Sequence, residues 1–313
     1  MSARRTGSEL PALALAGLLA ACGGSPGTSG TAGAGEERSP MRAPPSPRPM
    51  GAVDEPQSKA GAVAPASQRP LCDPGAPLPA EVPAGAGAGE LHRLGQERIL
   101  ERDGAAALVV LSRAAELAPD DAAILGDLAT ALLQCRMHER ALERIERAVE
   151  LAPEDVDLLA NLAQTYQIAK RYRDSAAAYR DAIELSPEDP ALYNNLAVVL
   201  VVLRELEDAE KAAREAVRLD PRSADYLINL GFVLYRQQRY PDAEMVLTRA
   251  VDLEPDNADA HNQLGIVLAA QRRNAQAAGE FRRALEIDPE HRAARENLKA
   301  VGKDFDIDGP WGR

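Results

Sequence analysis

The residues that most often carry catalysis or bind metals are few in this sequence and far apart. Neither a glycine loop that cradles phosphate nor the glycine pattern around a nucleophilic serine occurs. The histidines do not show the spacing of a recognisable metal site: His92, His138, His261 and His291. We therefore expect a protein that is not an enzyme and that has no metal, no cofactor and no small-molecule substrate.

The acidic segment 303–313 has a second pattern that could do chemistry. Asp304, Asp306 and Asp308, followed by Gly309, repeat the opening of a calcium loop. The bidentate glutamate that completes such a loop does not follow, so we expect no calcium site. We interpret the segment as a flexible acidic tail. Its aromatic residues, Phe305 and Trp311, leave open that it docks on a partner or in the protein's own groove.

Cys22 follows a segment with the features of an export signal. Residues 1–21 begin with a basic stretch and continue with an apolar run of about twelve residues, short of the roughly 20 that span a bilayer. The motif Leu19-Ala20-Ala21-Cys22 resembles the lipobox of bacterial lipoproteins. An ordinary secretory signal with a chance cysteine is the alternative.

The lipoprotein resemblance implies that residues 1–21 are a cleaved signal peptide and that Cys22 becomes the first residue. Cys22 would then carry acyl chains such as palmitate, which together anchor a protein stably in a membrane. Gly23 follows Cys22, whereas an aspartate there retains lipoproteins in the inner membrane of well-studied double-membraned bacteria. The resemblance therefore implies an outer-membrane protein that faces the periplasm.

Charge excludes one class of partner. The formal net charge is −12 at pH 7, and the acidic excess lies in residues 88–313. Nucleic acids and anionic lipid heads are bound by lysines and arginines that neutralise phosphates. We therefore expect no nucleic-acid partner, and membrane contact through the lipid anchor only.

Residues 22–87 are rich in Gly, Pro, Ala and Ser and lack apolar periodicity, which predicts a disordered linker. A flexible coil of about 65 residues has an end-to-end distance on the order of 45 Å, enough to hold a folded part away from the membrane. Cys72 lies in this linker and Cys135 in the folded part. An oxidising envelope would permit a disulfide between them, but the spacing does not require one.

The strongest pattern is a period of 34 residues. Proline recurs at this spacing, at Pro119, Pro153, Pro187, Pro221, Pro255 and Pro289. With proline at position 32 of each repeat, position 7 is always leucine, position 27 is always alanine, and positions 8 and 20 are small. Small residues let two antiparallel helices approach closely while the leucines interdigitate, and proline follows the end of the second helix.

This period and pattern resemble the tetratricopeptide repeat. The resemblance implies an all-α fold, a right-handed α-solenoid of six tandem 34-residue helix-turn-helix repeats. The solenoid occupies residues 88–302, with repeats 88–121, 122–155, 156–189, 190–223, 224–257 and 258–291 and a C-terminal capping helix 292–302. Position 34 is Asp, Ser or Asn before the later repeats, which predicts N-caps. Gly87 and Gly89 predict that the first helix begins late.

In this family the first helices of the repeats line a concave surface that binds partners. Position 6 carries amides there: Asn161, Asn195, Asn229 and Gln263. An amide donates and accepts hydrogen bonds at once, and the row resembles amide ladders that hold the backbone of an extended peptide in some relatives. The alternative is that asparagine is simply common at this position.

Apolar residues predict a patch on the same surface. The first helix of the fourth repeat is hydrophobic on nearly all sides, as in a buried helix, yet a solenoid leaves one side open. The predicted patch comprises Val198, Val202, Ile228, Phe232, Tyr235 and Ile266. An exposed patch of this kind usually marks a binding site, and packing between repeats is the alternative.

These features predict a lipid-anchored adaptor of the bacterial envelope that captures a segment of another envelope protein in its concave groove. The six-repeat plan resembles the pilotin lipoproteins that help secretin rings of type IV pili assemble at the outer membrane. Two other roles stay open. One is an adaptor for peptidoglycan-remodelling enzymes. The other is a structural subunit of an envelope complex that uses the convex face or self-association.

Overall fold

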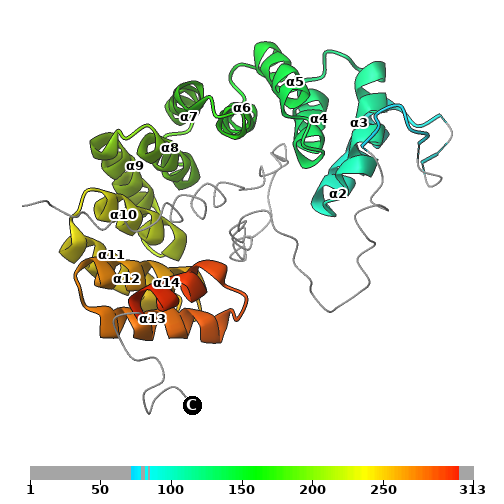
Figure 1. The fold of residues 1–313 in the computed structure, drawn as a ribbon. Helices are drawn as coiled ribbons and strands as arrows, with labels where there is room; N and C mark the ends of the chain where they lie inside the picture. The colour runs from blue at the N-terminus through cyan, green and yellow to red at the C-terminus, as the bar shows by residue number, and fades with distance from the viewer. Residues whose placement is uncertain (1–71, 79–81, 84, 303–313) are drawn as a thin grey trace, which may run out of the picture. The chain divides into compact units, whose positions relative to one another are not determined.

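The computed structural model describes residues 72–78, 82–83 and 85–302, which are coloured in Figure 1. Every regular element in this part of the chain is an α-helix. The bounds are α2 Ala88–Leu100, α3 Gly104–Leu117, α4 Ala122–Gln134, α5 His138–Leu151, α6 Val156–Ile168, α7 Tyr172–Leu185, α8 Pro190–Val202, α9 Leu206–Leu219, α10 Ala224–Arg236, α11 Tyr240–Leu253, α12 Ala258–Ala270, α13 Asn274–Ile287 and α14 Arg292–Gly302. The signal segment, Cys22, most of the linker and the tail 303–313 lie outside the described residues.

The helices confirm the all-α class and the tandem helix-turn-helix repeats. Even-numbered helices from α2 to α12 are the first helices of the repeats, and odd-numbered helices from α3 to α13 are the second. The last helix, α14, has the bounds predicted for the capping helix. The first helix begins at Ala88, so the late start that Gly87 and Gly89 predicted is wrong.

The chain divides into two compact units whose boundary falls in the first turn of α8, between Leu192 and Tyr193. The first unit contains α2 to α7, and the second contains most of α8 and α9 to α14. Within each unit the two helices of a repeat pack together. First helices also pack on one another, α2 on α4 and α4 on α6 in the first unit, and α10 on α12 and α12 on α14 in the second.

Small residues bring the paired helices into direct contact. The alanines of position 27 are completely buried: Ala114, Ala148, Ala182, Ala216, Ala250 and Ala284. At position 8 the space is tighter still, since a Cβ on Gly265 would lie 2.5 Å from Cε1 of Phe281. The side chain of α13 therefore packs against the bare backbone of α12.

The predicted N-caps are present. Each side chain at position 34 accepts a hydrogen bond from a backbone N–H in the first turn of the next helix: Asp121, Asp155, Asp189, Ser223 and Asn257. Each such cap stabilises its helix by about 1 kcal/mol. His291 caps α14 in the same way, its Nδ1 accepting from the Ala294 N–H at 3.2 Å, which the sequence reasoning missed.

Shortly after each first helix ends, one residue has a left-handed backbone conformation. Its φ lies between 58° and 64° at Arg102, Arg136, Lys170, Arg204, Gln238 and Arg272. After α6, the Lys170 N–H donates to the Gln167 carbonyl at 3.0 Å, and the Arg171 N–H to the Tyr166 carbonyl at 2.8 Å. These bonds form a Schellman motif, in which glycine is the usual left-handed residue. None of the six positions here has glycine.

We expect Lys170→Gly to raise the free energy of unfolding by about 0.5–1 kcal/mol. The substitution removes a left-handed strain of about 1–2 kcal/mol, and the greater freedom of glycine in the unfolded chain offsets part of that gain. The matched control is Ala169→Gly, one residue earlier at φ −74°, which should instead lower stability by about 0.5–1 kcal/mol. Urea denaturation measures both. A loss of stability in Lys170→Gly would contradict the argument.

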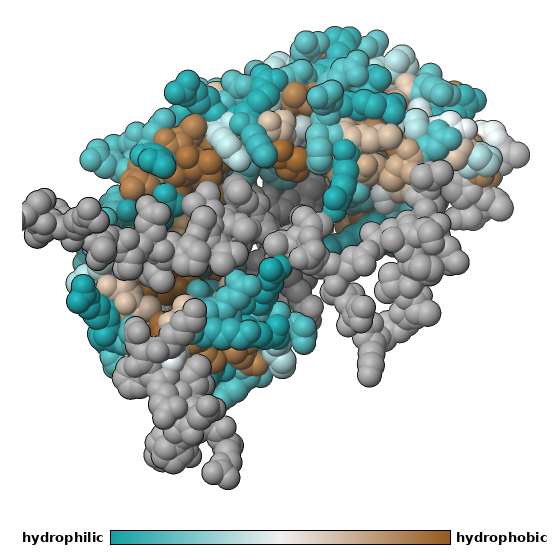
Figure 2. All heavy atoms as spheres, viewed as in Figure 1, coloured by the Kyte–Doolittle hydropathy of each residue, from teal (hydrophilic) through white to brown (hydrophobic). Residues whose placement is uncertain are grey.

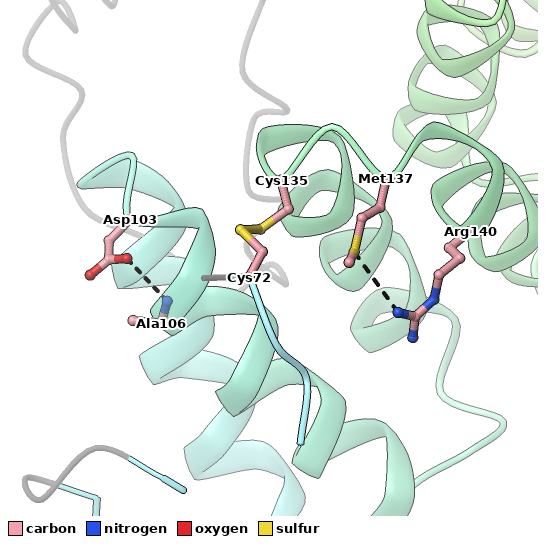
Figure 3. The surroundings of a disulfide bond; sticks show 6 residues. All are labelled: Cys72, Asp103, Ala106, Cys135, Met137 and Arg140. Atoms are coloured by element: carbon pink, nitrogen blue, oxygen red, sulfur yellow. Dashed lines mark hydrogen bonds between the residues drawn. A yellow bond between two sulfur atoms is a disulfide. The ribbon is translucent and has the colours of Figure 1, made fainter. Parts of the chain in front are cut away.

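The end of the predicted linker belongs to the folded structure. Cys72 forms a disulfide with Cys135, the C-cap residue of α4, with the Cα atoms 5.9 Å apart (Figure 3). Val82 and Ala86 pack against a buried apolar cluster of α2, α3 and α4. The disulfide that the sequence left open is therefore formed. At these residues the structure differs from the prediction of a disordered linker to residue 87, because the bridge and the apolar contacts hold the segment.

Candidate partner-binding surface

The predicted amides all lie on first helices, but they differ in exposure. Asn161 lies on α6 in the first unit, while Asn195, Asn229 and Gln263 lie on α8, α10 and α12 in the second. Asn195 and Asn229 are buried, whereas Asn161 and Gln263 are half-buried. Asn161 and Gln263 are therefore more accessible to a partner than Asn195 and Asn229.

Hydrogen bonds inside the fold occupy part of this row. Asn229 Nδ2 donates to Asn194 Oδ1 at 2.7 Å, and both side chains are buried. The same geometry recurs where Asn297 Nδ2 donates to Asn262 Oδ1 at 3.0 Å. Each bond joins position 5 of one first helix to position 6 of the next. Asn229 therefore uses one of its donors to hold neighbouring repeats together.

The sequence reasoning missed Asn194, Asn262 and Asn297. The signal that could have found them is the 35-residue separation of the two partners in each pair, one more than the repeat.

The first unit joins the same two positions with a histidine and a carboxylate. His92 Nε2 lies 2.7 Å from Asp127 Oδ2, and Gln96 Nε2 donates to the same oxygen at 2.8 Å. The hydrogen bond to Asp127 raises the pKa of His92 above its ordinary value, against the opposing effect of burial. This histidine thus bridges α2 and α4.

The predicted apolar patch is only partly open. Val198, Ile228 and Phe232 are buried, with exposed fractions of 2%, 7% and 1%. Val202, Tyr235 and Ile266 are half-buried and offer the accessible part of the patch. Which of these side chains a partner contacts stays a prediction.

Aromatic rings cluster at the C-terminal end of α10. The Tyr235 ring centroid lies 6.5 Å from that of Phe232 and 5.8 Å from that of Tyr240. The guanidinium carbon of Arg236 lies 5.7 Å from the Phe232 centroid. Burial raises the pKa of the Tyr235 phenol, and the neighbouring Tyr240 adds to the shift. The cluster combines apolar area, a hydroxyl and a cation on one helix end, which suits recognition of a polypeptide.

A hollow of about 480 Å³ lies among α11, α12 and α13. Leu264 and Leu268 of α12 contribute its apolar lining. At its edge Arg273 pairs with Glu244 at 2.6 Å and holds the pKa of that carboxyl below its ordinary value. The paired charges neutralise each other there. Figure 2 shows that one face of the molecule is mainly hydrophilic, with separate apolar patches.

Comparison with protein families decides the classification. One tetratricopeptide repeat model matches residues 161–224 and 228–292, and a second matches residues 98–165. Together they cover more than half of the chain. The chain belongs to the tetratricopeptide repeat family. No curated protein matches it.

Solved tetratricopeptide repeat structures show the same fold at low identity. The Cut9–Hcn1 hetero-tetramer of APC/C is 18% identical, with a TM-score of 0.58 over 69% of this chain but only 43% of that one. Pseudomonas aeruginosa PilF is 18% identical, with a TM-score of 0.57 over 68% of this chain and 97% of that one. A double mutant of MamA RS-1 is 22% identical, with a TM-score of 0.50 over 55% and 96%. The chain thus spans less than half of the Cut9–Hcn1 chain and nearly all of the other two.

Neither a metal-binding cluster nor a membrane-spanning helix occurs in the described residues. In residues 72–78, 82–83 and 85–302, no three or more His, Cys, Asp or Glu side chains gather in a way that could hold a metal ion. No helix in that part of the chain has both the length and the apolar character needed to cross a bilayer.

Proposed function

We propose that this tetratricopeptide repeat protein is a lipid-anchored adaptor of the bacterial envelope that binds a segment of another envelope protein. The observation that carries the proposal is the partly open surface of α10 and α12. There Tyr235 and Ile266 supply apolar area, and Gln263 supplies an amide, on helices whose other faces are packed. Such a surface offers an extended peptide both apolar contacts and backbone hydrogen bonds.

Two features support an envelope location. The lipobox Leu19-Ala20-Ala21-Cys22 favours export and acylation of Cys22. The disulfide between Cys72 and Cys135 favours an oxidising compartment, since such bridges form and persist outside the cytosol. An outer-membrane anchor that faces the periplasm accommodates both.

Site-specific crosslinking tests the adaptor role. A photo-reactive residue is placed at Tyr235 in the full-length protein, and at Met245 as the control, which is 67% exposed on α11, the second helix of the same repeat. We expect one envelope protein to be captured from Tyr235 and not from Met245, and Gln263→Ala to reduce the capture. Capture from Met245 alone would instead favour a structural subunit that uses the second helices.

Assistance to a pilus or secretin complex is the finer form of the proposal. Its test is the state of the secretin in a strain that lacks this protein. Loss of the assembled secretin ring, restored by the wild-type gene but not by a Cys22→Ala variant, is the expected result. A normal ring in the deletion strain would rule out this role and leave the broader adaptor role standing.

A further inference from the structure

Arg236, the last residue of α10, carries a charge that the described residues do not neutralise. Its Nη1 is buried and has no hydrogen-bond partner among them. The Phe232 ring, 5.7 Å away, attracts the guanidinium but offers no hydrogen-bond acceptor in the plane of its N–H groups. A buried donor without an acceptor is costly. The described residues therefore leave this N–H without an acceptor, at a half-buried side chain that a further group can reach.

Neighbouring arginines show what is missing. Arg239 pairs with Glu210 at 2.8 Å and with Asp242 at 2.7 Å, and Arg273 pairs with Glu244 at 2.6 Å. Among the arginines of the described residues, Arg236 differs from the rest in having a guanidinium nitrogen that is buried without an acceptor. Charge complementarity identifies the missing acceptor as a carboxylate, which forms the strongest hydrogen bonds with a guanidinium.

Another arginine without a carboxylate partner lies at the corresponding end of the next repeat. Arg272 follows α12 in the left-handed conformation and is exposed, with no ion pair to any described residue. The first helices α10, α12 and α14 pack in succession. Because alternate helices of such a stack are parallel, Arg236, Arg272 and Gly302 lie at equivalent ends of three neighbouring helices.

The segment that follows Gly302 carries carboxylates and is long enough to reach Arg236. Its sequence is Lys303-Asp304-Phe305-Asp306-Ile307-Asp308, in which acidic and apolar residues alternate. Packed helices lie about 8–10 Å apart, so the ends of α14 and α10 are separated by about 20 Å. Six extended residues span about 20 Å, so an extended chain that starts at Gly302 is long enough to bring Asp308 to Arg236.

We propose that residues 304–308 bind across this end of the second unit, with the Asp308 carboxylate accepting hydrogen bonds from Arg236. On an extended segment the three aspartates share one side and Phe305 and Ile307 the other. Asp304 then lies near Arg272, and the apolar side meets the half-buried Tyr235 and Ile266. This contact does not depend on the proposed partner. Where a partner binds the same surface, the segment competes with it.

The single tryptophan of the chain, Trp311, reports on the contact because it lies three residues beyond Asp308. We expect acrylamide to quench Trp311 less in the full-length protein than in a synthetic peptide of residues 303–313. Arg236→Gln and Asp308→Asn should each lower the docked-to-free ratio about tenfold, as for the loss of one hydrogen bond between charged groups. In the double variant, Trp311 should be quenched about as strongly as in either single variant, since both changes remove the same interaction.

Arg282→Gln is the matched control, because Arg282 is exposed on α13 and its loss changes the charge equally. It should leave the quenching unchanged. Circular dichroism of Arg236→Gln separates release of the segment from loss of the fold. Asp308→Asn lies outside the repeats, so it carries the test even if Arg236→Gln unfolds. The proposal is overturned if wild-type Trp311 is quenched as readily as in the peptide, or if Asp308→Asn leaves a shielded Trp311 shielded.

Discussion

Replacing Cys135 with serine is expected to lower the free energy of unfolding of the first unit by about 3–4 kcal/mol. The bridge to Cys72 closes a loop with a sequence separation of 63 residues. Closing a loop of that length removes about 4 kcal/mol of conformational entropy from the unfolded chain. The bridge also holds Val82 and Ala86 on the apolar cluster at the start of the repeats. Its loss therefore uncovers that cluster as well.

The measurement is urea denaturation of the oxidised full-length protein, with hydrogen exchange to locate the change. Faster exchange should be confined to α2–α7 and should spare α10–α13, because repeat proteins are stabilised by nearest-neighbour contacts. The control is the double variant Cys72→Ser with Cys135→Ser, whose stability a reducing agent should not alter. Wild-type protein should lose stability when reduced. Equal midpoints for reduced and oxidised wild type would show that the bridge does not stabilise the unit.

The repeats could be predicted from the sequence because they depend on local and periodic features. Proline at position 32 and a capping side chain at position 34 act within a few residues of themselves. For this reason the bounds of α14 and the caps at Asp121 and Ser223 agree with the prediction. The left-handed residues were not predicted, because a sequence marks such a position by glycine and these positions have residues such as Arg136 and Lys170.

The surface could be predicted only in outline. The period placed Asn229 on a first helix, but its bond to Asn194 depends on how two helices are offset and on two side-chain rotamers. The same holds for Phe232, whose burial depends on its neighbours rather than on its own position in the repeat. The pairing of Cys72 with Cys135 has no periodic signal at all, because one partner lies outside the repeats.

Arg236 shows a further limit of the sequence. An arginine on a helix end reads as a solvated charge, and only the structure shows that its Nη1 is buried without a partner among the described residues. Asp304 to Asp308 likewise read as a solvated acidic tail when they are considered alone. The two features become informative together, because Arg236 lacks a carboxylate partner among the described residues and the aspartates supply carboxylates.

Gly265→Ala is expected to destabilise the second unit by up to about 2 kcal/mol, even though alanine is the better helix former. The new Cβ would lie 2.5 Å from Cε1, 2.8 Å from Cδ1 and 3.0 Å from Cζ of Phe281. Phe281 is 1% exposed, so its ring cannot move aside without displacing other core residues. Such overpacking costs about 1–3 kcal/mol. It outweighs the gain of about 1 kcal/mol that alanine brings to a helix interior.

Gly279→Ala on the adjacent helix is the matched control, because a Cβ there meets nothing within 4 Å. It should stabilise the unit by about 0.5–1 kcal/mol through helix propensity alone. Guanidinium unfolding of both variants gives the comparison. The same substitution in a Phe281→Ile background tests whether the Phe281 ring is the obstacle. The second repeat already combines an alanine, Ala129, with an isoleucine, Ile145, at the positions equivalent to Gly265 and Phe281. If Phe281 is the obstacle, Gly265→Ala should cost less in a Phe281→Ile background. An equal cost in both backgrounds would mean that the ring contact is not what excludes a side chain at position 265.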